Sequence, residues 1–382
     1  MKKVAVVTAT RAEYGILRPL LRRLKEETEI DLQLLVTGTH LSEKYGRTQD
    51  EILQDGMEIY RKIPILENGN TPYDISITMA NAIRGFAAYF REEKPHLLVV
   101  LGDRTELLGI CSAAMNEQIP IAHLHGGELT EGAVDDCVRH AITKMSYLHF
   151  PTTEIYRRRI IQMGEEPKRV FAVGALGVEN ILSVPLLSYE QICEEAEIPL
   201  HQKYVVVTFH PVTLEMGAVK EQVQELIEAM ERKEEYFYLI TKANADVGGE
   251  RVNHMFADLE SQRKNVRMVS SLGMKRYLSA VKYSEFVMGN SSSGVIEAPA
   301  LGTPTVNIGN RQKGRIMAET VISCEPKLQE ILWAMEKAEQ LEHQKSKLFG
   351  DGHTSEKIVT VIKEFLKQDH KTLQKVFYDL NR

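Results

Sequence analysis

Residues 288–315 read MGNSSSGVIEAPALGTPTVNIGNRQKGR, and the fold can be worked out from this stretch. An apolar strand ends at Met288, and a turn rich in glycine and serine leads into a short helix predicted over residues 295–301. Gly302 is expected to cap the helix, and Pro304 forbids its continuation, so that a new strand begins directly afterwards. Strand, turn, helix and strand in this order are typical of a parallel α/β sheet.

The turn at residues 289–294 is also a candidate phosphate site. Backbone N–H groups at the start of a helix lack intrahelical partners, and the helix dipole and serine hydroxyls add to their attraction for an anion. Glu297 is expected one turn inside the helix, too far in to act as a cap, where it can accept hydrogen bonds from a diol such as ribose. Arg311 and Arg315 follow the next strand and can supply positive charge. An ordinary serine-rich N-cap is the alternative interpretation.

The alternation of strand and helix runs through the whole chain. In the first half, apolar strands are predicted at residues 4–7, 30–36, 97–101 and 119–124. In the second half, further strands are predicted at residues 204–209, 236–240 and 266–269. Helices are predicted between the strands, among them residues 134–145 and 219–232. This pattern predicts an α/β fold with parallel sheets that helices cover on both faces.

Polar residues directly follow several of these strands. Because ligands bind beyond the carboxyl ends of the strands in such sheets, the polar residues are expected on one rim. They are residues 8–11, His40, residues 103–104 and residues 125–128.

A chain of 382 residues is too long for one compact domain, which predicts two. The periodicity weakens around Gly174, Gly177 and Pro185. We therefore expect an N-terminal domain over residues 1–174 and a C-terminal domain over 175–356. A C-terminal helix over residues 357–382 is expected to pack back on the first domain.

Composition and charge exclude several classes of protein. The net charge of −6 argues against a nucleic-acid or membrane binder. No apolar run approaches 18 residues, and the run after Lys3 ends at Arg11, too early for a signal peptide. We therefore expect a cytoplasmic protein. The loop at residues 8–13 lacks the G-x-G-x-x-G pattern of dinucleotide-binding folds, which argues against bound NAD.

The cysteines are far apart in the sequence and form no CxxC or Cys/His cluster. Free, buried thiols in a reducing compartment are therefore expected. They are Cys111, Cys137, Cys193 and Cys324.

A series of motifs makes the chain similar to a known family. In order they are RAEYG at 11–15, LGDR at 101–104, HGGE at 125–128, RHAITK at 139–144, HPVT at 210–213, GNSSSG at 289–294 and GNRQKGR at 309–315. Together they resemble the hydrolysing UDP-N-acetylglucosamine 2-epimerases of the sialic-acid and legionaminic-acid pathways. The likeness covers nearly the whole chain. It implies the GT-B architecture, in which two Rossmann-like domains face each other across a cleft and the C-terminal domain holds most of the UDP.

The resemblance implies an enzyme that acts on a UDP-N-acetylhexosamine. A base removes the C2 proton while UDP leaves C1, and water then adds to the glycal with inversion at C2. Two acid/base groups on opposite faces of the sugar suffice, and cations or N–H donors stabilise the departing diphosphate. The substrate is UDP-GlcNAc, which gives ManNAc, or UDP-2,4-diacetamido-2,4,6-trideoxyglucose, which gives the corresponding mannose epimer. No cofactor or metal is implied, and a homodimer or homotetramer is expected.

The matched motifs also imply the residues of the site. The catalytic candidates are Asp103, Glu128, Asp135 and His210. The residues implied to bind UDP or the substrate are Arg11, His40, Arg104, His125, Asn244, Leu272, Ser291, Ser292, Glu297 and Arg311.

Some of these candidates have purely structural alternatives. Asp103 lies between a strand and a helix, where aspartate is a favoured N-cap. Asp135 lies where acidic residues stabilise the dipole of a helix. His125 stands where non-hydrolysing relatives carry a carboxylate, which favours hydrolysis but leaves the individual proton transfers open.

Three other functions compete with a hydrolysing epimerase. A GT-B glycosyltransferase uses the same UDP site but passes the sugar to an acceptor. A non-hydrolysing UDP-GlcNAc 2-epimerase keeps the sugar attached to UDP. A regulator that only binds the sugar nucleotide does not need Asp103, Glu128 and Asp135 together.

Overall fold

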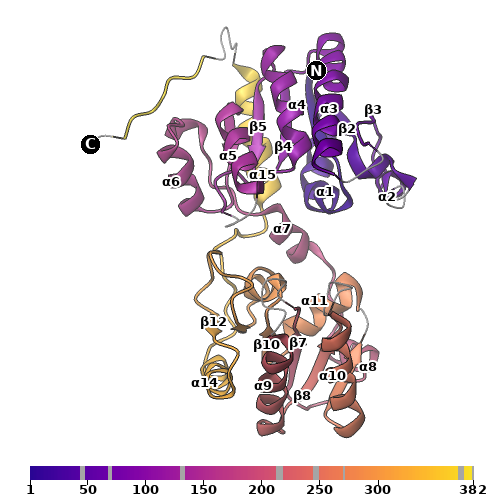
Figure 1. The fold of residues 1–382 in the computed structure, drawn as a ribbon. Helices are drawn as coiled ribbons and strands as arrows, with labels where there is room; N and C mark the ends of the chain where they lie inside the picture. The colour runs from indigo at the N-terminus through magenta and orange to yellow at the C-terminus, as the bar shows by residue number, and fades with distance from the viewer. Residues whose placement is uncertain are drawn as a thin grey trace. The chain divides into compact units, whose positions relative to one another are not determined.

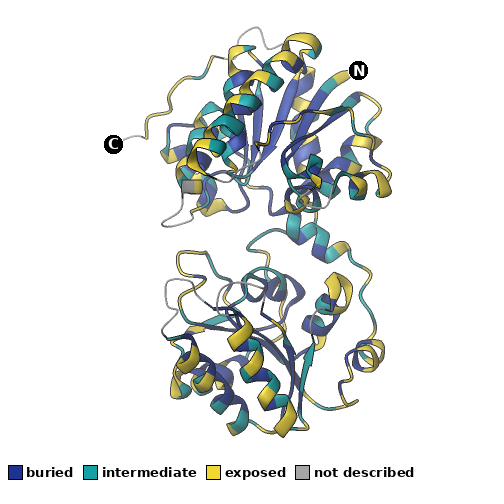
Figure 2. Cartoon of the chain, turned by 45° about the vertical axis from the view of Figure 1, so that its right-hand side comes forward, coloured by how far each residue is buried: buried dark blue, intermediate teal, exposed yellow. Residues whose placement is uncertain are grey.

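The computed structural model describes residues 1–43, 48–67, 71–129, 134–211, 218–243, 249–269, 272–368 and 374–380. The chain folds into two compact units, one of Met1–Asn180 with Gly350–Arg382 and the other of Ile181–Phe349 (Figure 1). Among the described residues, each unit has one parallel sheet of six strands. The central strands of both sheets are buried, and the helices expose their outer faces (Figure 2). The predicted α/β class is therefore confirmed.

The first sheet has the strand order β3-β2-β1-β4-β5-β6. Its strands are β1 (Lys2–Thr8), β2 (Ile30–Val36), β3 (Arg61–Lys62), β4 (Leu97–Leu101), β5 (Ile121–Leu124) and β6 (Leu148–Phe150). Successive residues of β1 belong to two different cores, Val4 and Val6 to one and Ala5 and Val7 to the other. Both faces of the sheet are thus buried, which explains the continuous apolar runs. The strand order reverses between β1 and β4, which is where such sheets bind ligands.

Helices cover both faces of the first sheet. One face is covered by α1 (Arg11–Glu26) and α15 (Thr354–Lys367), and the other by α3 (Pro72–Glu93), α4 (Thr105–Asn116) and α5 (Val134–Met145). The remaining helices of this unit are α2 (Gln49–Gln54), α6 (Glu154–Gln162), η1 (Gly38–Leu41) and η3 (Pro167–Arg169).

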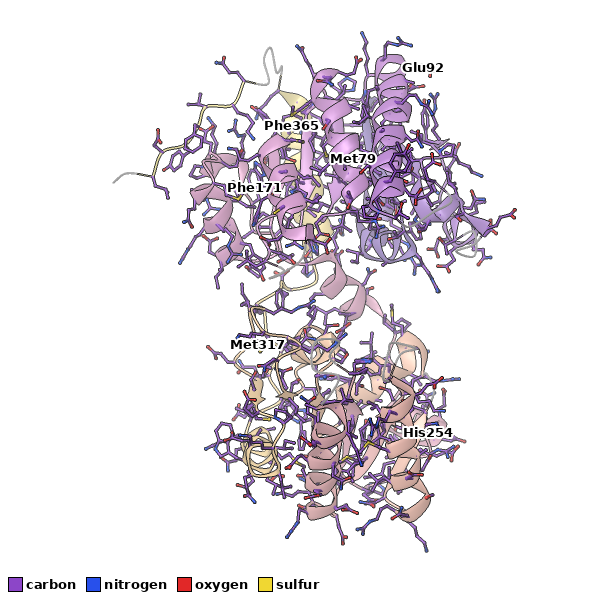
Figure 3. All side chains as sticks on the ribbon, viewed as in Figure 1. Met79, Glu92, Phe171, His254, Met317 and Phe365 are labelled. Carbon is purple, nitrogen blue, oxygen red and sulfur yellow. The ribbon has the colours of Figure 1, made fainter. Side chains whose placement is uncertain are left out.

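The C-terminal helix is shorter than the expected range of 357–382. It ends at Lys367, and residues 374–380 have no regular secondary structure. Figure 1 shows α15 (yellow) back among the elements of the first unit, and Figure 3 labels Phe365 on it. Phe365 packs in the same core as β1. Downstream, Lys375 Nζ pairs with Glu165 at 2.7 Å, so the residues beyond the helix are also attached to this unit.

The second sheet has the order β12-β11-β10-β7-β8-β9. Its strands are β7 (Tyr204–Thr208), β8 (Phe237–Thr241), β9 (Val266–Val269), β10 (Phe286–Gly289), β11 (Thr305–Ile308) and β12 (Val321–Cys324). Its helices are α8 (Tyr189–Glu195), α9 (Val219–Arg232), α10 (Gly249–Gln262), α11 (Gly273–Tyr283), α12 (Ser292–Val295), α13 (Glu297–Leu301) and α14 (Leu328–Glu339). Here the strand order reverses between β7 and β10, so these two strand ends mark the ligand-binding position of this sheet.

The chain leaves the first unit within helix α7 (Leu176–Ser183). Leu176 packs in the first core, and Asn180 Nδ2 donates to the Gly15 carbonyl at 2.6 Å. Glu179 accepts hydrogen bonds from the backbone N–H (2.6 Å) and hydroxyl (2.5 Å) of Ser355, where the chain has returned. These contacts place the changeovers at 180/181 and 349/350, beside the boundaries expected at 174/175 and 356/357.

The short helix predicted over residues 295–301 is wrong in detail. Helix α12 starts earlier, at Ser292, and Ile296 separates it from α13, so Glu297 opens a new helix instead of lying one turn inside the first. Pro299 explains the break, because it has no N–H to donate to the carbonyl four residues earlier. Gly302 caps α13 with φ +88°, as predicted.

Two further expectations concern the cysteines and membrane spans. All four cysteines are free, but Cys137 is exposed, so the expectation of buried thiols is wrong for this residue. It lies on the outward face of α5. Within the described residues, no helix combines the length and apolar character that a membrane span requires.

Candidate active site

In the first unit, the loops after β1, β4 and β5 form a polar edge, here called the first rim (residues 8–13, 102–106 and 125–129). Arg139 of α5 joins two of these loops. It forms an ion pair with Asp103 and donates through Nη1 to the Glu128 carbonyl at 2.9 Å. Its side chain is only 7% exposed, so this pairing is shielded from solvent. The loops after β4 and β5 are therefore held at a fixed separation.

The pKa of Asp103 is raised by its surroundings. Burial raises the pKa of its carboxyl group, the Arg139 guanidinium opposes this, and the charges of Asp135 and Glu128 raise the pKa further. The N-cap interpretation of Asp103 is wrong, because the N-cap residue of α4 is Arg104. Asp135 lies exposed in the first turn of α5, close enough to influence Asp103.

Glu128 and His125 form a second polar group on the first rim. His125 Nδ1 lies 3.5 Å from Glu128 Oε1, which also accepts a hydrogen bond from the Thr152 hydroxyl at 3.1 Å. Gly127 has φ +77°, and a Cβ there would lie 2.7 Å from the Tyr156 carbonyl oxygen. The HGGE motif therefore needs its second glycine to place the glutamate carboxylate.

Two histidines under the first rim are fully bonded within the unit. His40 is buried, with Nε2 3.0 Å from the Thr8 hydroxyl and Nδ1 2.8 Å from the Thr48 hydroxyl. Burial lowers its pKa to about 4. His123 donates through Nε2 to the Gly102 carbonyl at 2.7 Å. The structure thus places His40 beneath the strand ends, with both ring nitrogens engaged by the protein.

The two arginines of the first rim differ in their surroundings. Arg11 is exposed, and its Nε donates to Glu51 at 3.0 Å. Arg104 donates through Nε to Glu106 Oε1 at 2.6 Å, and the Glu106 carboxylate is buried.

In the second unit, the loops after β7 and β10 form the second rim (residues 208–211 and 289–297). Asn290 joins them, because its side-chain amide accepts from the His210 N–H and donates to the His210 carbonyl, both at 2.7 Å. The Asn290 carbonyl in turn accepts from Gln312 Nε2 at 2.9 Å and Arg311 Nη1 at 3.1 Å. His210 and Arg311 are thereby brought to the same strand end.

A close approach of the two strands requires a glycine in this turn. Gly289 has φ +135°, and a Cβ there would lie 2.0 Å from the Thr208 carbonyl oxygen. The turn that follows presents Ser291 as the N-cap of α12, with its hydroxyl accepting from the Ser293 N–H at 3.3 Å, and Ser292 as the first helical residue.

Glu297 has the features of a ligand-binding acceptor. Its Oε2 atom is buried and has no hydrogen-bond partner among the described residues, and burial raises the pKa of its carboxyl group. A buried acceptor without a partner is costly, so a bound hydroxyl would relieve the cost. Leu272 is buried directly before α11, and Asn244 lies outside the described residues.

The structure thus brings together most of the predicted residues within each unit. Asp103, Glu128 and His125 lie on the first rim, with Asp135 of α5 close to Asp103. His210, Ser291, Ser292 and Glu297 lie on the second rim, and Arg311 bonds to it through the Asn290 carbonyl. Sequence reasoning did not select Arg139, which joins two loops of the first rim, or Asn290, which joins two loops of the second. Arg139 lies in the RHAITK motif and Asn290 in the GNSSSG motif, but the partners of both residues come from other loops, which no local pattern indicates.

Comparison with known proteins gives a consistent result. The sequence profile of the family described as UDP-N-acetylglucosamine 2-epimerase matches residues 22–363. The Campylobacter jejuni protein named GDP/UDP-N,N'-diacetylbacillosamine 2-epimerase (hydrolyzing) is 37% identical over 342 residues, covering 89% of this chain and 88% of the relative. The Escherichia coli polysialic acid biosynthesis protein P7 is 38% identical, covering 100% and 98%. The Legionella pneumophila protein named UDP-N,N'-diacetylbacillosamine 2-epimerase (hydrolyzing) is 34% identical, covering 95% and 96%.

Solved structures show the same fold. The Neisseria meningitidis UDP-GlcNAc 2-epimerase bound to UDP-GlcNAc matches with a TM-score of 0.77 at 18% identity, covering 95% of this chain and 100% of that one. The putative UDP-N-acetylglucosamine 2-epimerase of Listeria monocytogenes matches with a TM-score of 0.79 at 17% identity, covering 98% and 100%. The fold is therefore of the GT-B type, with two Rossmann-like domains.

Proposed function

The chain belongs to the UDP-N-acetylglucosamine 2-epimerase family, and we propose that it is a hydrolysing 2-epimerase of a UDP-N-acetylhexosamine. It releases UDP and the 2-epimeric free sugar. The observation that carries this proposal is the similarity, over most of the chain, to relatives named as hydrolysing 2-epimerases, at 34% and 37% identity. The paired carboxylates of the first rim agree with it, because binding alone does not require them.

The first rim supplies the proton transfers in this proposal. Asp103 and Glu128 come from different strand ends and are held apart by Arg139. One carboxylate removes the C2 proton, and the electron pair of the C2–H bond forms the C1–C2 double bond while the C1–O bond to UDP breaks. Water oxygen then adds to C1, and the second acid/base group delivers a proton to the opposite face of C2. The raised pKa of Asp103 suits a group that must hold a proton during turnover.

The second rim supplies the UDP site. Ser291, Ser292 and the N–H groups that open α12 donate to the diphosphate, and Arg311 neutralises the charge that grows as UDP departs. His210 lies at the same strand end and is assigned to the diphosphate. The buried Oε2 of Glu297 accepts from ribose hydroxyls.

The sugar is the finer part of the proposal, and we assign UDP-2,4-diacetamido-2,4,6-trideoxyglucose, that is, UDP-N,N'-diacetylbacillosamine. Two relatives carry this substrate in their names. UDP-GlcNAc is the second candidate, because a relative that matches the whole chain is named for polysialic acid biosynthesis. Both candidates predict a role in making sialic-acid-like sugars.

A competition assay tests the function and the sugar together. The purified protein is incubated with both UDP-sugars and no acceptor, and the products are identified by NMR. Release of UDP with 2,4-diacetamido-2,4,6-trideoxymannose is expected. ManNAc as the main product would reassign the substrate to UDP-GlcNAc. No UDP release from either sugar would point to a glycosyltransferase that needs an acceptor.

We also propose a cytoplasmic homodimer or homotetramer. The free cysteines are compatible with a reducing compartment. Light scattering after size-exclusion chromatography is expected to give two or four times the chain mass of 43.3 kDa.

A further inference from the structure

Arg104 stands at the position where the strand order of the first sheet reverses. It is the N-cap residue of α4, in the loop that follows β4, and its side chain is 43% exposed. Its Nε donates to Glu106 Oε1 at 2.6 Å, while the Glu106 side chain is only 8% exposed. A partly exposed cation on the rim is thus fastened to a carboxylate beneath it.

A second buried carboxylate approaches from the neighbouring strand. Glu13 lies in the first turn of α1 after β1, and its Oε2 accepts from the Ala9 N–H at 3.0 Å and the Thr10 hydroxyl at 3.2 Å. Burial raises the pKa of Glu13 to about 7, Arg104 opposes this, and Glu106 adds to it. The three side chains therefore act on one another across the ends of β1 and β4.

Ordinary surface pairing does not account for this arrangement. Arg61 and Glu92 also form a 2.6 Å ion pair, but the Glu92 side chain is 62% exposed and lies in the last turn of α3 (Figure 3). Such exposed pairs contribute little to stability. Burying a carboxylate costs free energy. Glu106 and Glu13 are nevertheless buried around Arg104, at the strand ends where ligands bind such sheets. An arginine held through Nε keeps its two terminal nitrogens in a fixed planar orientation.

We propose that Glu106 and Glu13 are positioning residues for Arg104. Glu106 fixes the plane of the guanidinium group, and Glu13 fixes the loop from β1 to α1 beside it. The terminal nitrogens of Arg104 then meet an anionic or carbonyl oxygen of the UDP-sugar without reorganising. This role rests on the proposed function, in which a UDP-sugar occupies the first rim.

Steady-state kinetics with the UDP-sugar test the part played by Glu106. Glu106→Gln is expected to lower kcat/KM by about tenfold or more, mainly through KM, because the charged hydrogen bond that orients Arg104 is lost. Glu106→Asp is expected to recover part of the loss. The double variant Glu106→Gln with Arg104→Lys is expected to be no worse than Arg104→Lys alone, since both changes disable one interaction. Glu92→Gln, which removes an exposed carboxylate from an equally short pair, is expected to leave KM unchanged.

Glu13 needs a different pair of variants. Glu13→Gln keeps an acceptor for the Ala9 N–H and is expected to keep KM within about threefold, whereas Glu13→Ala is expected to raise KM about tenfold. An unchanged KM in Glu13→Ala would remove Glu13 from the proposal.

The proposal as a whole is overturned if Glu106→Gln melts at a lower temperature but keeps its KM and kcat, or if the effects of the double variant are additive. If Glu106→Gln does not fold, as judged by circular dichroism, the same comparison with Glu106→Asp decides. If the wild type releases no UDP, the proposed function has failed. Calorimetric binding of the UDP-sugar to the same variants then tests the positioning role separately.

Discussion

At the scale of single residues, Asp103 has the most direct bearing on turnover in the proposed mechanism, because its partly buried carboxylate pairs with Arg139 and burial raises its pKa. Asp103→Asn keeps the size of the side chain but removes its proton-transfer chemistry. We expect the rate of UDP release to fall by about two orders of magnitude or more, with UDP affinity unchanged. A coupled UDP-release assay and calorimetry with UDP measure the two effects. A variant that is less stable but fully active would show that the residue is only structural.

Glu13 gives a prediction about stability and pH. Its folded-state pKa of about 7 lies above its ordinary value of 4.5. Between pH 4.5 and 7 the folded protein holds a proton that the unfolded chain has lost, so this contribution is complete below pH 4.5 and disappears as the pH rises through 7. Glu13→Gln lacks this dependence. As the pH rises from 5 to 8, we expect the free energy of unfolding of the wild type to fall by on the order of 2–3 kcal/mol relative to that of the variant.

Urea unfolding at the two pH values measures this difference. Glu92→Gln serves as the control, because Glu92 is exposed and its loss should not change the relative stability in this window. Parallel pH dependence of the wild type and Glu13→Gln would contradict the prediction.

The sequence revealed some single residues of the site and not others. Asp103, Glu128 and Ser291 follow predicted apolar strands, so their place on a rim could be predicted from topology. Arg139 and Asn290 could not be singled out, because their partners come from other loops. A tertiary pairing of this kind leaves no local pattern in the sequence.

At the scale of elements, the proposed UDP site depends most on the turn from β10 into α12. Replacing Ser291 and Ser292 together by alanine removes two hydroxyl donors from the diphosphate. At roughly 1.5–3 kcal/mol for a hydrogen bond to a charged group, UDP affinity should fall by about tenfold or more. Calorimetry with UDP measures the change.

Ser188→Ala is the matched control for this turn. Ser188 is the N-cap of α8 and accepts from the Gln191 N–H at 3.3 Å, the same length as the Ser291 cap. Each cap should contribute about 1 kcal/mol of stability, but only the loss of Ser291 with Ser292 should affect UDP. Equal UDP affinity in all three proteins would remove the phosphate site from this turn.

Elements differed in how well they could be predicted. Helix α5 (Val134–Met145) and strand β4 (Leu97–Leu101) begin and end at the predicted residues, because their apolar patterns are long and regular. The edge strands β3 (Arg61–Lys62) and β6 (Leu148–Phe150) were missed, because two or three residues are too few to show a period. The break at Ile296 was also missed, although Pro299 was the available signal.

At the scale of the whole molecule, the chain combines two doubly wound sheets to which we assign different roles. The first unit holds the paired carboxylates, and the second holds the serine turn and the buried Glu297 oxygen. The alternation of strand and helix predicted both sheets. The order of the strands could be read only from the structure, because local periodicity does not indicate which distant strands pair. The return of α15 to the first unit also depends on its packing with that core.

The most direct test of the central claim is turnover of the UDP-sugar in D2O. If the C2 proton is removed to the protein and replaced from solvent, the released sugar must carry deuterium at C2 with inverted configuration. Mass spectrometry and proton NMR of the free sugar detect both features. We expect essentially complete incorporation at C2, together with oxygen from water at C1. A released sugar that retains its original hydrogen at C2 would contradict elimination and rehydration, and with them the proposed mechanism.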